Sequence, residues 1–341
     1  MTKRRIPSWA WTTLKLAVAA CIIGWMFRAG VIRVDDLRSA GSRWPFILLG
    51  LACVLACIMI QSVRWGFLLR AQGIRLGFWR LYALMMTGFF FTIVAPGGLG
   101  GDAVKAFYVA RGQTKKAEAA TTVFLDRFLG LATLFFVAGI MIVVDFRNLW
   151  NLSTEKGDVA GIPFGRVLVI AVGACAASMA LFAVLVMSKR LRRTGLLGRL
   201  ARFVPFRQAV RKVYEALHLY GDHPRELAWA AAASIIAQVP LYAAYYLYGL
   251  AVGVDIKPWH CALIVAPAMV IRVLPLVPAG AGQGMAAMAL LFPLVGIQEG
   301  AAIGAIGDAV FIIVCLMGGA FFVLEKSSYG AIRAAAETET P

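Results

Sequence analysis

Residues 81–118 read LYALMMTGFFFTIVAPGGLGGDAVKAFYVARGQTKKAE, which is an apolar arm, a turn rich in Pro and Gly, and a second arm that is charged. The second arm carries too many ionisable side chains to face lipid. Non-helical backbone at membrane depth is tolerated only where protein or a water-filled cavity surrounds it. We therefore predict a re-entrant hairpin over residues 79–118, which turns at Pro96–Gly101 and returns to the face from which it entered.

The composition of the whole chain indicates a membrane protein. The chain has 341 residues, of which 61% are hydrophobic and 15% are charged, whereas soluble domains are about 25% charged. Several apolar runs are long enough, or nearly so, to cross ~30 Å of hydrocarbon at ~1.5 Å per residue. We predict an all-α integral membrane protein with six full spans. The runs are Leu14–Met26, Pro45–Ile60, Leu129–Val144, Val167–Met187, Leu227–Val252 and Ala301–Leu324.

The distribution of Lys and Arg predicts the orientation of these spans. The loop Lys189–Arg225 has a large excess of basic over acidic residues, so it is expected on the cytoplasmic side. The N-terminus, with Lys3, Arg4 and Arg5, follows the same rule, although Arg28–Arg43 fits it less well. Two cytoplasmic segments must be separated by an even number of crossings, and the spans between them already number four. Residues 79–118 are therefore expected not to cross. We predict a bacterial-type cytoplasmic (inner) membrane protein with both termini cytoplasmic.

The second half of the chain repeats the order of the first. Trp259–Leu276 leads into Pro278-Ala-Gly-Ala-Gly-Gln-Gly284 and a short apolar arm, which predicts a second hairpin over 258–296. Each half reads span, span, hairpin, span, but the halves start from opposite faces, so we predict an inverted repeat. Matching Gly/Pro interruptions in two inverted halves indicate a transporter's midplane site. Independent Gly-rich loops are the alternative. The predicted boundaries are 1–145 (first repeat), 146–163 (outer loop), 164–325 (second repeat, with basic insertion 189–225) and 326–341 (C-terminal tail).

The first Gly-rich turn has the features of an anion site. A helix that starts after it would present unpaired backbone N–H groups and a partial positive charge. Asp102 is predicted to cap this helix, and Lys105 lies one turn later on the same side. Capping alone, and snorkelling of Lys105 and Arg111, are the structural alternatives. The residues of the turn that would let a head group approach the backbone are Pro96, Gly97, Gly98, Gly100 and Gly101.

Asp126 and Arg127 lie about 11 Å inside a helix that begins near Ala119. An ionised side chain at that depth costs a few kcal/mol. Adjacent residues point about 100° apart, so we predict that each faces the protein interior, with the first hairpin as the nearest partner. A later helix start would instead make both residues interfacial.

Other polar residues lie within apolar surroundings in both halves. Arg272 and Asp308 are predicted either to form a pair, or to leave Arg272 free for phosphate. Arg64, near the inner end of the second predicted span, is a further candidate to line the transport path. The aromatic side chains are predicted to mark the interfaces: Tyr242, Tyr245, Tyr246 and Tyr248 as an outer belt, and most Trp residues, Trp65 among them, at segment ends.

Several function classes are not expected. The six cysteines form no CxxC and no His stands at ligand spacing, so we predict neither a disulfide framework nor a metal site. No Walker A sequence is present, so ATP hydrolysis is not expected as the motor. We expect no cofactor and no catalytic residues. The net charge of +17 favours anionic lipid head groups over nucleic acid as partners.

Residues 95–111, APGGLGGDAVKAFYVAR, followed by Asp126-Arg-Phe-Leu-Gly-Leu131, resemble the lysylphosphatidylglycerol synthase transmembrane family. The likeness covers most of the chain, including Arg64-Trp-x-x-Leu-Leu69 and Pro275-x-x-Pro-x-Gly-x-Gly282. It implies a flippase-like fold. The sequence departs from the family at Lys105, where Arg is common, at Gln283–Met285, where an acidic residue is usual, and at Gly307 and Asp308, where Arg is frequent. The soluble aminoacyl-lipid synthase domain is not present before Pro341, so synthesis of lysyl-lipid is not expected.

These observations lead to one preferred function and two alternatives. We predict a flippase or transporter for a lipid or lipid-linked head group, which binds the anionic head group at the two Gly/Pro-rich turns. The expected partners are membrane lipids and, second, a separate lipid-modifying enzyme. One alternative is a membrane-embedded lipid-modifying transferase or its lipid-presenting subunit, with Asp102 or Asp126 as a catalytic carboxylate. The other is a small-solute or ion transporter. The predicted binding residues of the second turn are Pro278, Gly280 and Gly282.

Overall fold

The computed structural model describes residues 41–94, 100–110, 116–144, 220, 223–273 and 282–338, together with positions 166, 169, 170, 173 and 177. Within these residues every regular element is a helix, which confirms the all-α prediction. The elements are α3 (Trp44–Ala71), α4 (Phe78–Val94), α5 (Gly100–Ala110), α6 (Lys116–Val144), α12 (Pro224–Val252), α13 (Pro258–Val273), α14 (Gln283–Leu291), η3 (Phe292–Val295) and α15 (Gly300–Thr338).

Four of these helices are long and apolar enough to cross a membrane. They contain four of the six predicted runs. Of the other two, Leu14–Met26 lies outside the described residues, and so does all of Val167–Met187 except four positions. The chain is therefore a membrane protein with several apolar helices. The candidate spans are Trp44–Ala71, Thr121–Ile140, Pro224–Val252 and Gly300–Val323.

The ends of α12 show how the sequence limits a span. Pro224 occupies the first helical turn, where its missing N–H costs nothing, and Glu226 adds an acid near the positive end. Gly253 ends the helix with a φ of 95°, a left-handed conformation that favours glycine. Its N–H and that of Val254 donate to the last free carbonyls, including that of Gly249.

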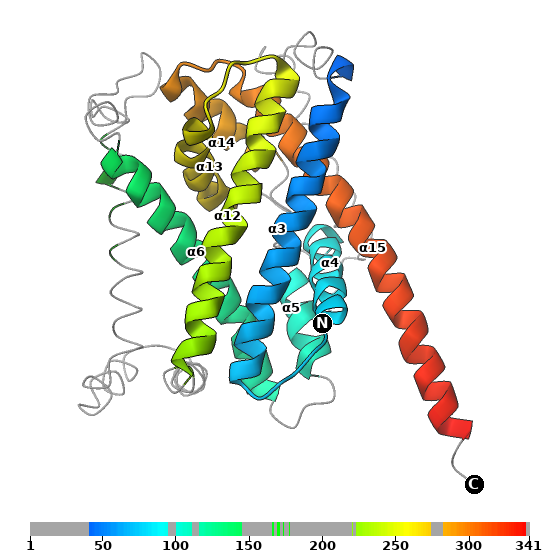
Figure 1. Cartoon of the computed structure of the whole chain (residues 1–341). Helices are drawn as coiled ribbons and strands as arrows, with labels where there is room; N and C mark the ends of the chain where they lie inside the picture. Colours follow the sequence, from blue (N-terminus) through cyan, green and yellow to red (C-terminus); the bar gives the residue numbers. More distant parts are fainter. Residues whose placement is uncertain are drawn as a thin grey trace, which may run out of the picture.

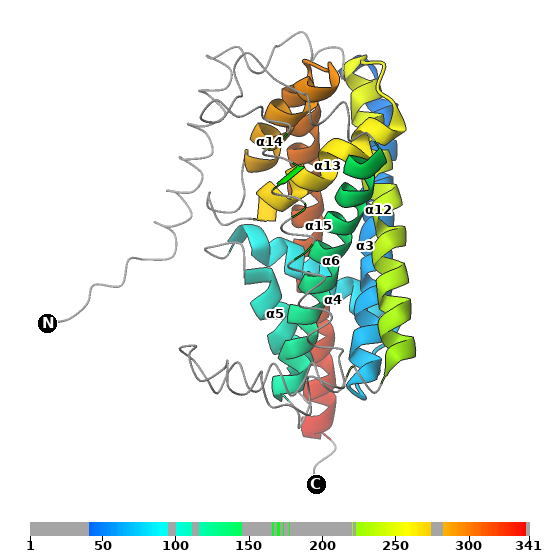
Figure 2. The same ribbon diagram turned by 90° about the vertical axis from the view of Figure 1, so that its left-hand side faces the viewer.

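The helices form two short hairpins held by long helices. In Figures 1 and 2, α4 and α5 lie in the half of the bundle nearer the C-terminus, whereas α13 and α14 lie in the opposite half. α3 and α12 pack against each other along their length and run in opposite directions. α6 and α15 complete the bundle, and α15 packs along α4. Each hairpin thus occupies one end of the bundle only.

In the first hairpin, α4 and α5 approach each other closely at two glycines. Gly101 of α5 faces Gly88 of α4, and the Cβ that a larger residue would add at position 101 would collide with the Gly88 carbonyl and come within 2.5 Å of Thr92 Oγ1. Lys105, one turn further along α5, reaches Met85, one turn back along α4. α4 and α5 therefore run in opposite directions.

Gly101→Ala is expected to force α4 and α5 apart. The obstacle is backbone, which cannot move without disturbing the hairpin, so we expect a loss of about 1–3 kcal/mol in stability. The measurement is the thermal unfolding midpoint of the purified protein in detergent. Gly139→Ala is the matched control, because nothing lies within 4 Å of the Cβ it would add. Equal midpoints for both variants would contradict the close packing of the hairpin.

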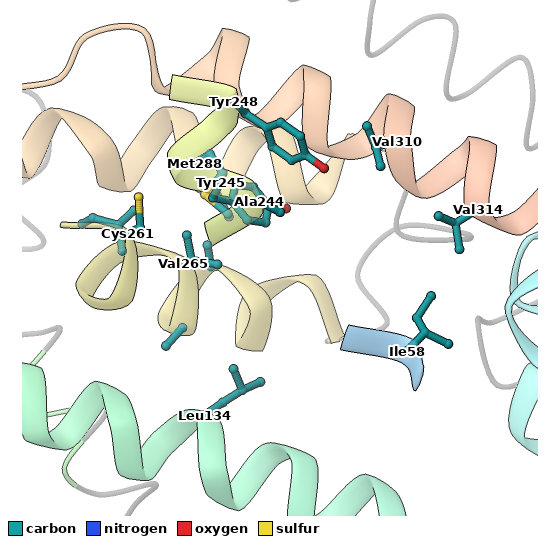
Figure 3. Packing of buried hydrophobic residues seen from close by; sticks show 14 of the residues in the cluster. Ile58, Leu134, Ala244, Tyr245, Tyr248, Cys261, Val265, Met288, Val310 and Val314 are labelled. Carbon is teal, nitrogen blue, oxygen red and sulfur yellow. The ribbon is translucent and has the colours of Figure 1, made fainter. Parts of the chain in front are cut away.

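The apolar core joins both halves of the chain. Figure 3 shows Ile58 of α3, Leu134 of α6, Val265 of α13, Met288 of α14 and Val310 of α15 around the end of α12. These side chains are all buried, Leu134 least so.

Two of the aromatic predictions are wrong. Tyr245 and Tyr248 are 4% and 1% exposed and lie inside the core, not in an outer belt. The Tyr248 ring fills the space left by Gly50, where a Cβ would collide with it. Trp65 is also fully buried and donates its indole N–H to Thr122 Oγ1 at 3.1 Å. Trp79 and Trp229, in contrast, are exposed near helix ends as predicted.

Candidate functional site

Five charged side chains from three helices meet beside the first hairpin. Arg64 comes from α3, Asp102 and Lys105 from α5, and Asp126 and Arg127 from α6. We call them the five-charge cluster. All five are among the residues predicted from the sequence, and the fold brings them together from positions up to 63 residues apart.

The cluster is a chain of alternating charge. Arg64 Nε lies 2.7 Å from Asp126 Oδ1, and Lys105 Nζ lies 3.7 Å from Asp126 Oδ2. The same Nζ lies 3.2 Å from Asp102 Oδ1, and Arg127 Nε lies 2.8 Å from Asp102 Oδ2. Lys105 is therefore shared between both carboxylates and links α5 to α6.

Asp126 lies inside the protein, and its helix does not start late. α6 begins at Lys116, earlier than expected, which places Asp126 about 15 Å along the helix. Its side chain is 2% exposed, whereas that of Arg127 is 46% exposed. Asp126 faces the protein interior as predicted, whereas the same prediction is wrong for Arg127. Both contact the first hairpin as predicted, Asp126 through Lys105 and Arg127 through Asp102. Asp126 is thus a buried residue that contacts two cations, and Arg127 lies at the exposed edge of the cluster.

Asp102 differs from its predicted role. It is the third residue of α5, inside the first turn, and its carboxylate contacts Lys105 and Arg127. The prediction that it caps the helix is therefore wrong. Lys105 does not snorkel either, because its side chain is only 6% exposed and its ammonium lies 5.4 Å from the Trp65 ring centre. Arg111 lies outside the described residues.

A small cavity opens beside the cluster. Its lining includes Gln61, Arg64, Lys105, Asp126 and Arg127, with Gly88 and Gly101 at the hairpin contact. Three cations and two carboxylates leave the cluster with one excess positive charge. A charge excess next to a cavity within helices attracts an anion, because low dielectric surroundings strengthen the interaction.

A second polar group lies beside the other hairpin. Arg272 Nη1 of α13 is 3.0 Å from Asp308 Oδ1 of α15, so the predicted pair forms. The backbone N–H of Met285, in the first turn of α14, donates to Asp308 Oδ2 at 3.2 Å. Gly284 is needed for this approach, because a Cβ there would lie 2.6 Å from Asp308 Oδ1. The Arg272 guanidinium also stacks on the Phe311 ring, with its carbon 4.2 Å from the ring centre.

Comparison with known families identifies the chain. Residues 12–319 match the model of the lysylphosphatidylglycerol synthase TM region. The chain belongs to this family. Membership associates it with a function related to membrane lipids. Comparisons with curated proteins and with solved structures gave no match.

In this member of the lysylphosphatidylglycerol synthase TM family, the Gly/Pro-rich turns are only partly described. Gly100 and Gly101 begin α5, and Gly282 precedes α14 with a φ of 73°. The remaining predicted turn residues lie outside the described residues: Pro96, Gly97, Gly98, Pro278 and Gly280.

Sequence reasoning missed several residues that contact the two polar groups. Ser234 of α12 lies beside Arg64, whose Nη1 donates to Ser234 Oγ at 3.5 Å. The Tyr245 hydroxyl of α12 lies beside Gly307, next to Asp308, because a Cβ on Gly307 would be 2.9 Å from it. The available signal was the spacing of polar residues along α12. Among the described residues no group of three or more His, Cys, Asp or Glu side chains could hold a metal ion.

Proposed function

We propose that this chain is a transporter, not an enzyme, and that it moves a lipid or lipid-linked molecule with an anionic head group across the bilayer. The observation that carries the proposal is the five-charge cluster, which has one excess positive charge beside a cavity. Buried charges in membrane helices are expensive and commonly mark substrate pathways. A phosphate group would supply the negative charge that the cluster lacks.

Arg127 is the residue best suited to make first contact with the head group. Its side chain is 46% exposed and lines the cavity. Both of its contacts with Asp102 use Nε, so that ion pair does not engage the terminal nitrogens. Arg pairs with phosphate through two parallel N–H donors. The Asp102 carboxylate would then compete with the substrate phosphate for the same guanidinium, which favours release after binding.

The order of the helices supports an inverted repeat with six full spans. α3, α4, α5 and α6 correspond in order to α12, α13, α14 and α15, and the two hairpins lie at opposite ends of the bundle (Figure 1). In our proposal each hairpin is re-entrant, one from each face. The two halves then alternate the access of the head group to the two leaflets, which is the usual mechanism of inverted-repeat transporters.

The proposed setting is a bacterial-type cytoplasmic membrane with both termini on the cytoplasmic side. The basic loop 189–225 and the positive-inside rule support this orientation. The proposed partners are anionic membrane lipids and a separate enzyme that modifies the lipid before or after transport.

Reconstitution tests the proposal. The full chain is placed in vesicles with trace phosphatidylglycerol labelled on an acyl chain, and label in the outer leaflet is bleached with dithionite. We expect bleaching beyond one half only in vesicles with protein, and faster exchange for phosphatidylglycerol than for labelled phosphatidylcholine. Exchange at the protein-free rate, with mass spectrometry showing a chemically altered lipid, would support the transferase alternative.

A further inference from the structure

One face of α12 carries a line of polar side chains. Ser234, Gln238, Tyr242 and Tyr245 are spaced by four, four and three residues, which places them on the same face of a helix. Eleven residues at ~1.5 Å each give the line a length of about 17 Å. We call this set the α12 polar stripe.

The α12 polar stripe begins at one charged group and ends at the other. Its first member, Ser234, accepts a hydrogen bond from Arg64 of the five-charge cluster. Its last member, Tyr245, has its hydroxyl beside Gly307, the neighbour of Asp308, since a Cβ on Gly307 would lie 2.9 Å from it. The stripe therefore joins the sites of the two hairpins.

The middle of the stripe contains polar atoms that need water. Within the described part of the chain, Gln238 Oε1 and the Tyr242 hydroxyl are buried and have no hydrogen-bond partner. Gln238 is 7% exposed. Leaving such an atom unpaired costs about 1–3 kcal/mol, and buried polar groups of this kind usually bind internal water.

α3 packs against α12 and also contributes polar groups to their interface. Gln61, which lines the cavity, donates from Nε2 to Cys57 Sγ at 3.1 Å. The Cys57 thiol donates to the Ala237 carbonyl of α12 at 3.2 Å. Polar groups thus continue from the cavity into the α3–α12 interface.

We propose that the α12 polar stripe holds a file of water that conducts protons between the two charged groups, and that Asp308 is the carboxylate that binds the proton. This inference rests on the proposed transport function and adds proton coupling to it. Chains of hydrogen-bonding and acidic side chains inside membrane proteins commonly serve as proton relays.

Protonation of Asp308 would leave the Arg272–Asp308 pair with one net positive charge. An excess proton conducted along the file passes from a hydronium ion, which becomes water, to a carboxylate oxygen of Asp308, which becomes a neutral carboxyl group. The groups that face it are Arg272 from α13, the Tyr245 hydroxyl from α12 and the Met285 N–H from α14. Arg272 then keeps its charge without a counter-ion and can bind the anionic head group. When the head group leaves, Asp308 returns the proton to water and pairs with Arg272 again.

The test measures proton flux and lipid exchange in the same vesicles. Vesicles of phosphatidylcholine and phosphatidylglycerol contain the full chain, a pH-sensitive dye and acyl-labelled phosphatidylglycerol. For the wild type we expect an imposed pH gradient to drive the labelled lipid toward one leaflet. Tyr242→Phe and Gln238→Leu should each reduce the protein-dependent proton flux about 10-fold and abolish this response, while exchange without a gradient continues. Tyr82→Phe removes the same hydroxyl from α4, where the ring packs against Phe321 outside the stripe, and should behave as wild type.

Different results would contradict proton coupling and lipid transport. Wild-type lipid exchange that ignores the pH gradient, or an unchanged proton flux in both stripe variants, would overturn the proton path and leave transport standing. Absence of any protein-dependent exchange would overturn the proposed function itself. Misfolding does not confuse the result, because Tyr242→Phe removes a hydroxyl that has no protein partner in the described residues. Its elution profile in detergent should match that of the wild type.

Discussion

Asp126→Asn is expected to lower the stability of the protein by about 3–5 kcal/mol, the usual cost of removing one partner from a buried ion pair. Asp126 is 2% exposed and contacts Arg64 and Lys105, which are themselves buried. The amide keeps the shape of the carboxylate but not its charge, so two cations would remain close together at membrane depth. The measurement is the thermal unfolding midpoint of the purified protein, with the yield of folded protein as a second readout.

A double variant shows whether the loss of stability comes from the unbalanced charge. Asp126→Asn combined with Lys105→Met leaves one buried cation instead of two, so it should recover part of the lost stability. Asp255→Asn removes an acid from an exposed position between α12 and α13 and should have little effect. A midpoint for Asp126→Asn equal to that of the wild type would show that the five-charge cluster does not hold α3, α5 and α6 together.

Arg127→Gln is expected to reduce transport of anionic lipid by about 10- to 100-fold while the protein stays folded. A hydrogen bond to a charged group contributes about 1.5–3 kcal/mol, and about 1.4 kcal/mol corresponds to a factor of ten. Arg127 is half exposed, so its loss leaves no buried charge of its own, and Asp102 keeps its contact with Lys105. The measurement is the initial rate of leaflet exchange in vesicles with equal protein content.

Two control variants define what the loss means. Arg70→Gln removes an exposed cation near the end of α3, outside the cavity, and should leave the rate unchanged. Arg127→Lys keeps the charge but not the two-pronged donor geometry, so an intermediate rate is expected. Equal rates for Arg127→Gln and Arg70→Gln would exclude Arg127 from the transport path.

The spans could be predicted because they depend on local composition. α3, α12 and α15 are long apolar segments, and their hydropathy requires no knowledge of their neighbours. The predicted start of the third span was late, since Leu129–Val144 covers only part of α6. Charges between Lys116 and Arg127 interrupt the apolar pattern. The helix tolerates Asp126 and Arg127 because other helices neutralise them.

The partners within the site could not be predicted. Asp126 pairs with Arg64, 62 positions away, and nothing in the spacing of either residue specifies the other. The chain reversal at the first hairpin was accessible from the sequence, because its second arm is too polar to face lipid. Tyr248 was misplaced for a related reason. Its burial depends on the space that Gly50 leaves on another helix, and a belt residue has the same sequence pattern.

The opposite entry faces of the two hairpins are tested most directly by cysteine labelling of sealed membrane vesicles with an impermeant maleimide. The six native cysteines are first replaced by alanine. Single cysteines are then introduced by Gly77→Cys and Lys116→Cys, which flank the first hairpin, and by Lys257→Cys and Gln298→Cys, which flank the second. We expect the first two to be labelled from one side of the membrane and the last two from the other side. Labelling of Gly77→Cys and Lys116→Cys from different sides would mean that residues 79–118 cross the membrane, and would contradict the two-hairpin arrangement.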